Sequence, residues 1–338
     1  MLYTKIDNQL KKLSTCLIQT SHGVKKLSRL IMKQGQTVTT IAMPDSFPVL
    51  GEDKTPYDSG TLVFNGLGIL FTQPGAHTFT IPFGVKKVHM VAIGAGGSGG
   101  LGGDHGSGGG GGGLAALNDV AVGPGQALDI DVGAGGKGAV NNTAYGFGID
   151  GGDSQVQGYL LATGGKKGGS DGAANNAAGE GGEGNIIISN VDDFVVGTGG
   201  SGGLSNPTTG IAVDGGGGGG AAGYGGNGGN GAGDVNGAVS NASGGVLGGG
   251  GGGGTTNSGF RGGMGGGVGA FGIGSAGSGG ASSTTGRNGF PGEAGSQHLS
   301  YPNDVFGAGS GGADNVEITV DAQNGAVLIC WGEPLVLS

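Results

Sequence analysis

Glycine is the residue that most limits how this chain can fold, because 93 of its 338 residues are glycine. Holding one backbone residue in a fixed conformation costs roughly 1–2 kcal/mol, and glycine has the most freedom to lose. A backbone hydrogen bond returns only about 1 kcal/mol net, and glycine has no side chain to bury. An ordered glycine segment must therefore pack backbone against backbone with its neighbours, and it must be anchored to a core made of other residues.

Disorder is the alternative that this composition leaves open, because glycine-rich stretches with little proline are typical of flexible linkers. Three features favour order between residues 94 and 313. Serine, glutamate and lysine are sparse there, and valine, isoleucine and leucine recur between the glycines. The mean hydropathy of the chain is nearly neutral, at +0.01. We therefore predict a rigid, layered body for this region.

A period of three residues is visible in GRNGFPGEAGSQ, residues 286–297, where glycine stands at every third position. A collagen triple helix requires that register without a break, and the flanking sequences do not keep it. The stretch YGGNGGNG at 224–231 has the same triplet form. Both stretches therefore predict single extended helices with three residues per turn and no internal hydrogen bonds, rather than a collagen domain.

The first 34 residues have a different pattern, in which apolar residues recur alternately three and four positions apart. This heptad spacing predicts an amphipathic helix that joins copies of the chain, most simply as a trimeric coiled coil. A single helix docked on a partner protein is the alternative. The residues assigned to the oligomerisation seam are Ile6, Leu10, Leu13, Leu17, Val24, Leu27 and Ile31.

The same segment is basic, with seven Lys and Arg residues against the single acidic residue Asp7. Its net charge is therefore +6, which leaves −15 for the rest of a chain whose total is −9. No aromatic residues alternate with the lysines as they do in many nucleic-acid-binding segments. We expect this segment to form a solvated face or to contact an acidic partner, and not nucleic acid.

Composition divides the chain into the helix at 1–34, an extended linker at 35–60 and a glycine-rich β domain at 61–338. From residue 61 the apolar period is two, which predicts strands at 61–65, 68–72, 77–82 and 85–93. In QALDIDV at 126–132, Leu128, Ile130 and Val132 should face a core.

The C-terminal stretch VEITVDAQNGAVLICWG, at 316–332, predicts a hairpin that turns at Asn324-Gly325. Its second strand is apolar on both faces, so we expect it at the centre of a sheet, with Trp331 in the core.

The motifs that would indicate catalysis or metal binding are weak. Matches to G-x-G-x-x-G are expected by chance in such a sequence, and the five histidines lack metal-ligand spacing. Asp150 and Asp153 resemble one calcium-binding turn, but one copy is not an array. The pair Asp192-Asp193 could serve a glycosidase, yet no groove of aromatic residues accompanies it. We predict no enzyme activity, no cofactor and no metal site.

Targeting features are also lacking in the sequence. Cys16 and Cys330 fall in separate modules, so no disulfide framework is implied. The first residues contain no apolar core of a secretory signal, and we found no run of 18 apolar residues. We expect no membrane insertion.

Two stretches resemble the glycine-rich domain of bacteriophage tail fibre and receptor-binding proteins. The first is HTFTIPFGVKKVHMV, residues 77–91, and the second is PGQALDIDVGAGG, residues 124–136, which follows the first glycine run. The matching residues are Thr80, Pro82, Gly84, Val85, Val88, Pro124, Gly125, Gln126, Ile130, Val132, Gly133, Gly135 and Gly136. The resemblance covers roughly residues 70–332. It implies a mainly β fold, namely a β-sandwich with inserted polyglycine II-type helices that display loops at a tip.

The resemblance also implies a function. It suggests a virion structural protein, a short tail fibre or adhesin, made in the host cytoplasm and placed on the outside of the tail or capsid. Its partners would be other virion proteins, bound through the N-terminal helix, and a host surface glycan or an outer-membrane protein. A head fibre, decoration or baseplate protein without a receptor is one alternative, and an enzyme acting on surface glycan is another. The receptor-binding candidates are Tyr145, Phe147, His298, Tyr301 and Phe306, although these side chains could instead pack against the β core.

Overall fold

The structure is a computed structural model of the whole chain. Beyond the six strands within residues 2–42, it describes residues 60–63, 67–82, 84–102, 105–139, 146–170, 177–205, 215–235, 238–255, 261–283, 289–297, 304–314 and 319–337. The regular elements among the described residues are all β-strands, and no helix occurs in them. The expectation of a mainly β fold is confirmed for this part of the chain.

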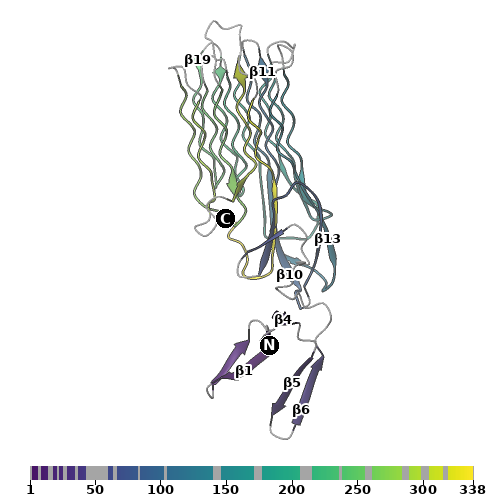
Figure 1. The fold of residues 1–338 in the computed structure, drawn as a ribbon. Coiled ribbons are helices and arrows are strands. Elements are labelled where there is room, and N and C mark those ends of the chain that lie inside the picture. Colours follow the sequence, from purple (N-terminus) through teal and green to yellow (C-terminus); the bar gives the residue numbers. More distant parts are fainter. Residues whose placement is uncertain are drawn as a thin grey trace.

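Two antiparallel sheets form one end of the glycine-rich body (Figure 1). The strands of the first sheet, in spatial order, are β17 (Phe194–Gly197), β12 (Leu114–Ala121), β10 (Lys87–Ile93), β23 (Ala326–Cys330), β8 (Gly68–Phe71) and β7 (Gly60–Val63). Those of the second are β16 (Gly184–Ile186), β15 (Leu160–Ala162), β14 (Ser154–Val156), β13 (Ala127–Val132) and β9 (Gly75–Thr80). Because β10 pairs with β23, strands from the two ends of the glycine-rich region lie side by side in the first sheet.

The two sheets share one hydrophobic core. Ile69, Met90 and Ile329 of the first sheet cluster with Phe79 and Ile130 of the second. The opposite face of the first sheet packs against a second cluster, which includes apolar residues from the ends of glycine segments. Both faces of the first sheet are therefore covered, and this explains why all five residues of β23 are buried.

Most of the strand predictions are confirmed, and one hairpin prediction is wrong. Leu128, Ile130 and Val132 of β13 are buried, as their alternation predicted. The first strand of the predicted hairpin is described only from residue 319, and residues 319–323 do not pair with β23. The amide nitrogens of Thr319 and Gly325 donate instead to carbonyl oxygens of residues 139 and 133. Residues 319–325 thus run beside the segment 133–139, and every third amide donates a hydrogen bond to it.

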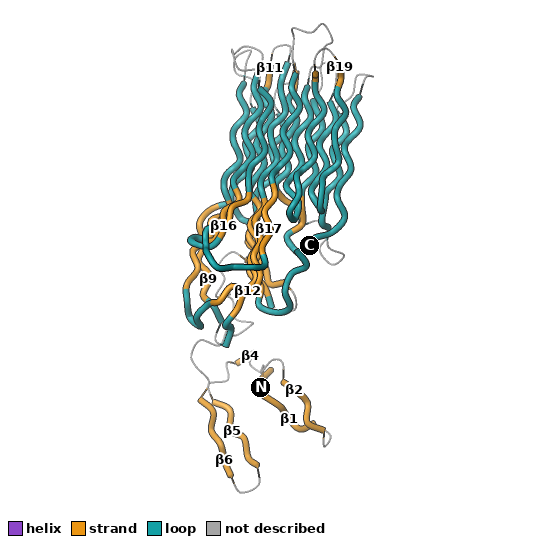
Figure 2. The backbone as a smooth tube through the Cα atoms, turned by 180° about the vertical axis from the view of Figure 1, so that it is seen from behind, coloured by secondary structure: helices purple, strands orange, loops and turns teal. Residues whose placement is uncertain are grey.

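Beyond the sheets, the chain runs back and forth through long segments that lie side by side and are not strands (Figure 2). Their hydrogen bonds repeat every three residues. The amides of Gly94, Gly97 and Gly100 donate to the segment 107–113, whereas those of Ala95 and Ser98 donate to the segment 149–152. Consecutive residues therefore bond to different neighbours. We call the set of these segments, between residues 94 and 325, the glycine lattice.

The segment at 106–113 shows the full pattern of the glycine lattice. Its amides donate to three neighbours and its carbonyl oxygens accept from three others. The six neighbours are the segments 94–100, 163–169, 179–182, 200–203, 216–222 and 307–310. Every residue from 106 to 113 is buried. The glycine runs at 215–220 and 248–254 likewise lie inside the lattice, bonded to neighbours on many sides.

Segments at the rim of the glycine lattice carry side chains at every third position. Ala177, Glu180 and Glu183 are exposed, as are Asn227 and Asn230, while the glycines between them are buried or partly buried. The collagen-like stretch is another such segment in its described part, because Gly289, Gly292 and Gly295 donate to the segment 261–267. The three-residue period of the sequence thus separates inward positions from outward ones.

Several short strand pairs complete the description. They are β11 (Leu101–Gly102) with β22 (Ala313–Asp314), β18 (Asp234–Val235) with β19 (Ala238–Val239), and β20 (Val268–Gly269) with β21 (Val305–Phe306). Near the N-terminus β1 (Leu2–Ile6) pairs with β2 (Gln9–Leu13), β3 (Ile18–Thr20) with β4 (Gly23–Lys25), and β5 (Arg29–Gln34) with β6 (Thr37–Ala42).

The three N-terminal pairs join no larger sheet among the described residues. An isolated two-stranded hairpin is at best marginally stable in water, and the residues between these strands lie outside the described part. The helix expected over 1–34 therefore stays a prediction, as do the boundaries at residues 34 and 60.

Candidate functional site

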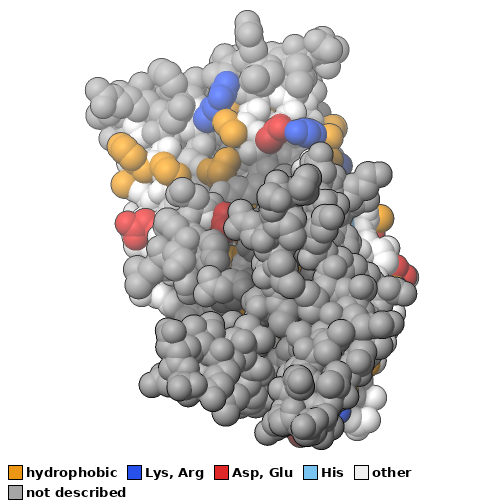
Figure 3. Space-filling view, turned by 60° about the horizontal axis from the view of Figure 1, so that its bottom comes forward, with side chains coloured by type: hydrophobic (Ala, Val, Ile, Leu, Met, Phe, Trp, Pro, Cys, Tyr) orange, Lys and Arg blue, Asp and Glu red, His pale blue; other side chains and the backbone are white. Residues whose placement is uncertain are grey.

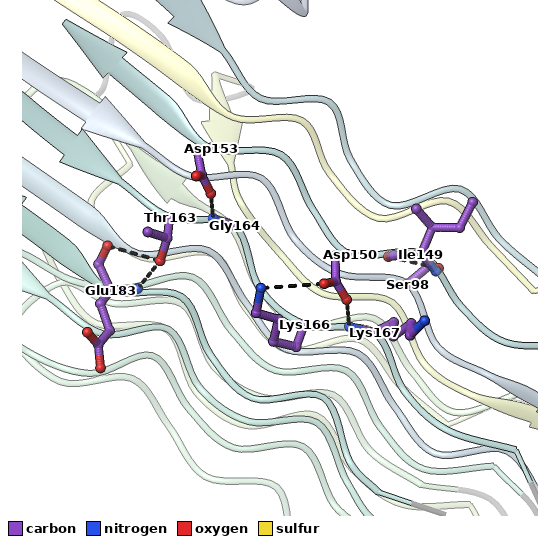
Figure 4. Close-up of polar contacts among 9 residues, drawn as sticks. All are labelled: Ser98, Ile149, Asp150, Asp153, Thr163, Gly164, Lys166, Lys167 and Glu183. Carbon is purple, nitrogen blue, oxygen red and sulfur yellow. Dashed lines mark hydrogen bonds and ion pairs between the residues drawn. The ribbon is translucent and has the colours of Figure 1, made fainter. Parts of the chain in front are cut away.

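Side chains take the place of missing neighbours at the rim of the glycine lattice. Asp153 Oδ1 accepts a hydrogen bond of 2.8 Å from the amide of Gly164, and Asp150 Oδ1 accepts one of 2.8 Å from the amide of Lys167 (Figure 4). Each carboxylate thus satisfies an outward-pointing N–H group of the next segment. We call such side chains edge caps.

Other edge caps follow the same spacing of three residues. Asp321 and Asn324 accept from the amides of Gly138 and Gly135, at 2.8 and 2.9 Å. The hydroxyl oxygens of Ser240 and Ser243 accept from amides of the segment 230–233. Sequence reasoning missed these caps, although acceptor residues at positions i and i+3 within glycine segments are a visible signal. The pair read as a possible calcium turn, Asp150 and Asp153, has this structural role.

Charge on the edge caps is partly balanced by lysines. Lys166 Nζ lies 3.4 Å from Asp150 Oδ2, and Lys137 Nζ lies 2.7 Å from Asp321 Oδ2. The side-chain hydrogen bond from Lys137 holds the pKa of Asp321 below its ordinary value, and the Gly138 amide adds to this effect. These exposed pairs fix the side chains of the rim but contribute little stability.

Phe147 and Lys167 form a different kind of pair on the same side of the glycine lattice. Phe147 stands three residues before Asp150, so the ring belongs to the same outward row as the two aspartates. Its side chain is 50% exposed. Lys167 Nζ lies 5.6 Å from the centre of the Phe147 ring, within the range of a cation–π contact. We call Phe147 and Lys167, with Asp150 and Lys166 beside them, the Phe147 platform.

The structure separates the five receptor-binding candidates. Phe147 lies on the surface, whereas Phe306 is only 9% exposed and belongs to the second hydrophobic cluster. Its strand β21 pairs with β20, and the side chain packs against the core, which is the alternative that the sequence left open for these residues. Tyr145, His298 and Tyr301 lie outside the described residues.

The oligomerisation candidates are not tested by this structure. Ile6, Leu10, Leu13, Val24 and Ile31 fall within β1 to β5, where the side chains are outside the described part, and Leu17 and Leu27 are outside it altogether.

Buried titratable groups belong to the core rather than to a reactive site. Burial raises the pKa of the Cys330 thiol to about 12, which keeps it protonated and poorly nucleophilic at neutral pH. Burial likewise raises the pKa of Tyr224 above its ordinary value, and its hydroxyl donates to the carbonyl oxygen of Gly269. The described residues contain no group of three or more His, Cys, Asp or Glu side chains that could hold a metal ion. They also contain no helix of the length and apolarity needed to cross a bilayer.

Comparison with known proteins gives one match. Residues 72–302, more than half of the chain, match a family described as a glycine-rich domain. No curated protein matches the chain. The matched range contains most of the glycine lattice and the whole Phe147 platform.

Proposed function

The chain belongs to the glycine-rich domain family, and from this premise we propose that it is a structural protein of a bacteriophage virion. Its role would be that of a short tail fibre or adhesin that attaches the particle to the host surface. In this proposal the two sheets form a β-sandwich, and the glycine lattice is a bundle of polyglycine II-type helices standing on it.

The observation that carries the proposal is the density of hydrogen bonds in the glycine lattice. The interior segment 106–113 bonds to six neighbours and is completely buried. A body of this kind resists bending, because displacing one segment breaks bonds to several others. Such stiffness suits a part that must hold a contact surface away from a particle, and it serves no evident purpose in an enzyme.

The direction of the segments supports the same proposal. Successive segments run in opposite directions, so 133–139 ends, and 146–153 begins, at the end of the lattice farthest from the sheets (Figure 1). The sheets anchor one end of the lattice, and the short strand pairs β11–β22 and β18–β19 lie at the opposite end (Figure 1). A surface for function that is held on a rigid scaffold is a common arrangement.

The surface is compatible with contact to a polar partner. In the view of Figure 3, charged side chains of both signs lie near one another, with hydrophobic side chains in small groups. Exposed apolar residues such as Phe290 and Val336 occur among the described residues. The second candidate function, a head fibre, decoration or baseplate protein without a receptor, uses the same stiffness but needs no contact surface.

Adsorption of the particle to host cells separates these functions. We expect particles that lack residues 61–338 to adsorb poorly, and purified full-length chain to compete with intact particles for cells. Normal adsorption without residues 61–338 would reject attachment and favour the second function. Release of sugar from purified host surface glycan by the chain would instead support an enzyme.

Oligomerisation through residues 1–34 is a separate part of the proposal. Light scattering on the full chain should give a trimer, and a chain that starts at Thr61 should give a monomer. A monomeric full-length chain would exclude the coiled coil and leave a docked single helix.

A further inference from the structure

Phe147 is exposed at a position where the glycine lattice does not require an aromatic residue. The other two members of its outward row, Asp150 and Asp153, are edge caps that accept hydrogen bonds from backbone amides. Phe147 is in neither hydrophobic cluster among the described residues, and half of its side chain remains in contact with solvent. The ring therefore adds little to the fold.

Lys167 is the charged partner of this ring. Lys87, Lys137 and Lys166 each form an ion pair with an aspartate. Among the described residues, no such pair is found for Lys167, and its ammonium group lies by the Phe147 ring. A lysine without a carboxylate partner, on a body whose net charge is strongly negative, is a place where an anionic group can bind.

The backbone holds the two side chains in fixed relative positions. The amide of Lys167 is bonded to Asp150 Oδ1, and the neighbouring Lys166 contacts the other oxygen of the same carboxylate (Figure 4). Next to Phe147, Gly148 lies so close to the backbone of Ser98 that a Cβ atom there would come within 3.0 Å of it. The Phe147 platform is thus preorganised, which lowers the entropy lost when a ligand binds.

We propose that the Phe147 platform binds an acidic saccharide, with the exposed ring against the apolar C–H face of a sugar and Lys167 paired with its carboxylate. Asp150 stands three residues from Phe147 in the same outward row and is paired with Lys166, so these two side chains could contact hydroxyl groups of a neighbouring sugar unit. The strand nearest to the platform is β11, and Leu101 in it pairs with Ala313 of β22 on one side and with Gly146, next to Phe147, on the other. Both edges of β11 are therefore occupied at this point, which disfavours an extended peptide as the ligand. The inference rests on the proposed attachment function for the source of the saccharide.

Binding to polygalacturonate, a polymer of one acidic hexose, tests the platform directly on the purified full-length chain. Neutral dextran and poly-L-glutamate are the comparison ligands. Phe147→Ala should weaken polygalacturonate binding roughly fivefold to tenfold, the range expected for loss of one exposed aromatic contact. Lys167→Gln should weaken it similarly and also reduce its dependence on salt.

Two matched variants control for general effects of these substitutions. Phe290 is 54% exposed on another rim segment, and Lys137 is paired with Asp321. Phe290→Ala and Lys137→Gln should leave binding unchanged, and the melting temperature of all four variants should stay near that of the parent. Equal binding of poly-L-glutamate with no effect of Phe147→Ala would overturn the saccharide inference in favour of nonspecific charge attraction. Failure to bind polygalacturonate would overturn the inference itself.

The results also distinguish this inference from the proposed function. If particles without residues 61–338 adsorb normally while Phe147→Ala weakens polygalacturonate binding, attachment fails and the platform stands. If adsorption requires residues 61–338 while polygalacturonate binding is insensitive to Phe147 and Lys167, the platform fails and attachment stands.

Discussion

Glycine is required inside the lattice because of the closeness of neighbouring backbones. A Cβ atom built on Gly111 would lie closer than 3.0 Å to the carbonyl oxygen of Gly220, and Gly108 meets Gly217 in the same way. Real Cβ atoms do not approach backbone so closely, and the surrounding backbone is fixed by its own hydrogen bonds. Alanine, the smallest alternative, is therefore too large at these interior positions.

Substituting alanine at an interior and at a peripheral glycine tests this explanation. Gly111→Ala should lower the free energy of unfolding by about 2–3 kcal/mol, as expected for overpacking. At Gly123 the nearest atom would lie 3.9 Å from an added Cβ atom. Gly123→Ala should therefore change the free energy of unfolding by less than about 0.5 kcal/mol. Thermal unfolding of both variants measures the difference, and equal stability would contradict the steric argument.

Edge caps are the second feature at the residue scale, and Asp153 provides the clearest test. Asp153→Ala removes the acceptor for the Gly164 amide and should cost about 1 kcal/mol. Asp153→Asn keeps an acceptor oxygen and should cost less. Hydrogen exchange at Gly164 should be faster in the alanine variant than in the asparagine variant. Equal exchange rates would show that solvent replaces the cap without loss.

The edge cap at Asp321 should make stability depend on pH. Its pKa is lowered mainly by the hydrogen bond from Lys137. A carboxyl whose pKa is lower in the folded state stabilises the fold above its unfolded pKa, about 3.9. That contribution is lost as the pH falls through the folded pKa. The difference in melting temperature between the parent and Asp321→Asn should therefore shrink below about pH 4, and a constant difference down to pH 2 would contradict this role.

At the scale of elements, β23 links the sheets to the glycine lattice. Val327 and Ile329 face the core between the two sheets, and Leu328 and Cys330 face the second cluster. The chain then places Trp331 against Phe79 of β9, with ring centres 5.7 Å apart and ring planes inclined by 19°. This strand therefore contributes to both cores at once.

Trp331 and Phe79 should differ in their effect on stability because they differ in burial. Phe79 is completely buried, whereas Trp331 is only partly buried against the same cluster. Phe79→Ala should cost about 3–5 kcal/mol, and Trp331→Ala about 2–3 kcal/mol. Denaturant unfolding followed by circular dichroism measures both, since Trp331 is the single tryptophan and its fluorescence is lost in one variant. A larger cost for Trp331 would indicate that its ring is more tightly packed than this contact implies.

At the scale of the whole molecule, stability should increase from the rim of the glycine lattice to its interior. An amide in the segment 106–113 can exchange only when several neighbouring segments move, whereas an exposed rim residue such as Glu180 meets solvent directly. Amides of Gly108 to Gly113 should exchange slowest, and those of Glu180 and Asn227 fastest. Hydrogen exchange read by NMR checks this order, and uniformly fast exchange between residues 94 and 313 would restore the linker interpretation.

The sequence by itself determined the features that depend on local periodicity. The apolar period of two located β13, because alternate residues of a strand face opposite sides, and the unbroken apolar run after Gly325 located β23 as a central strand. The period of three in 289–296 and 224–231 located rim segments, because every third residue of such a helix lies on the same side. The high glycine content also required backbone packing, because glycine offers nothing else to bury.

Only the tertiary structure decided which segments become neighbours. Asn324-Gly325 has the composition of a hairpin turn, yet residues 319–325 lie beside 133–139, where their amides find acceptors at every third residue. Phe306 resembles a loop residue in sequence, but β21 pairs with β20 and carries it into the second cluster. Glycine segments look alike locally, so their order in space is set by how many backbone neighbours each can reach, and that is a property of the assembled lattice.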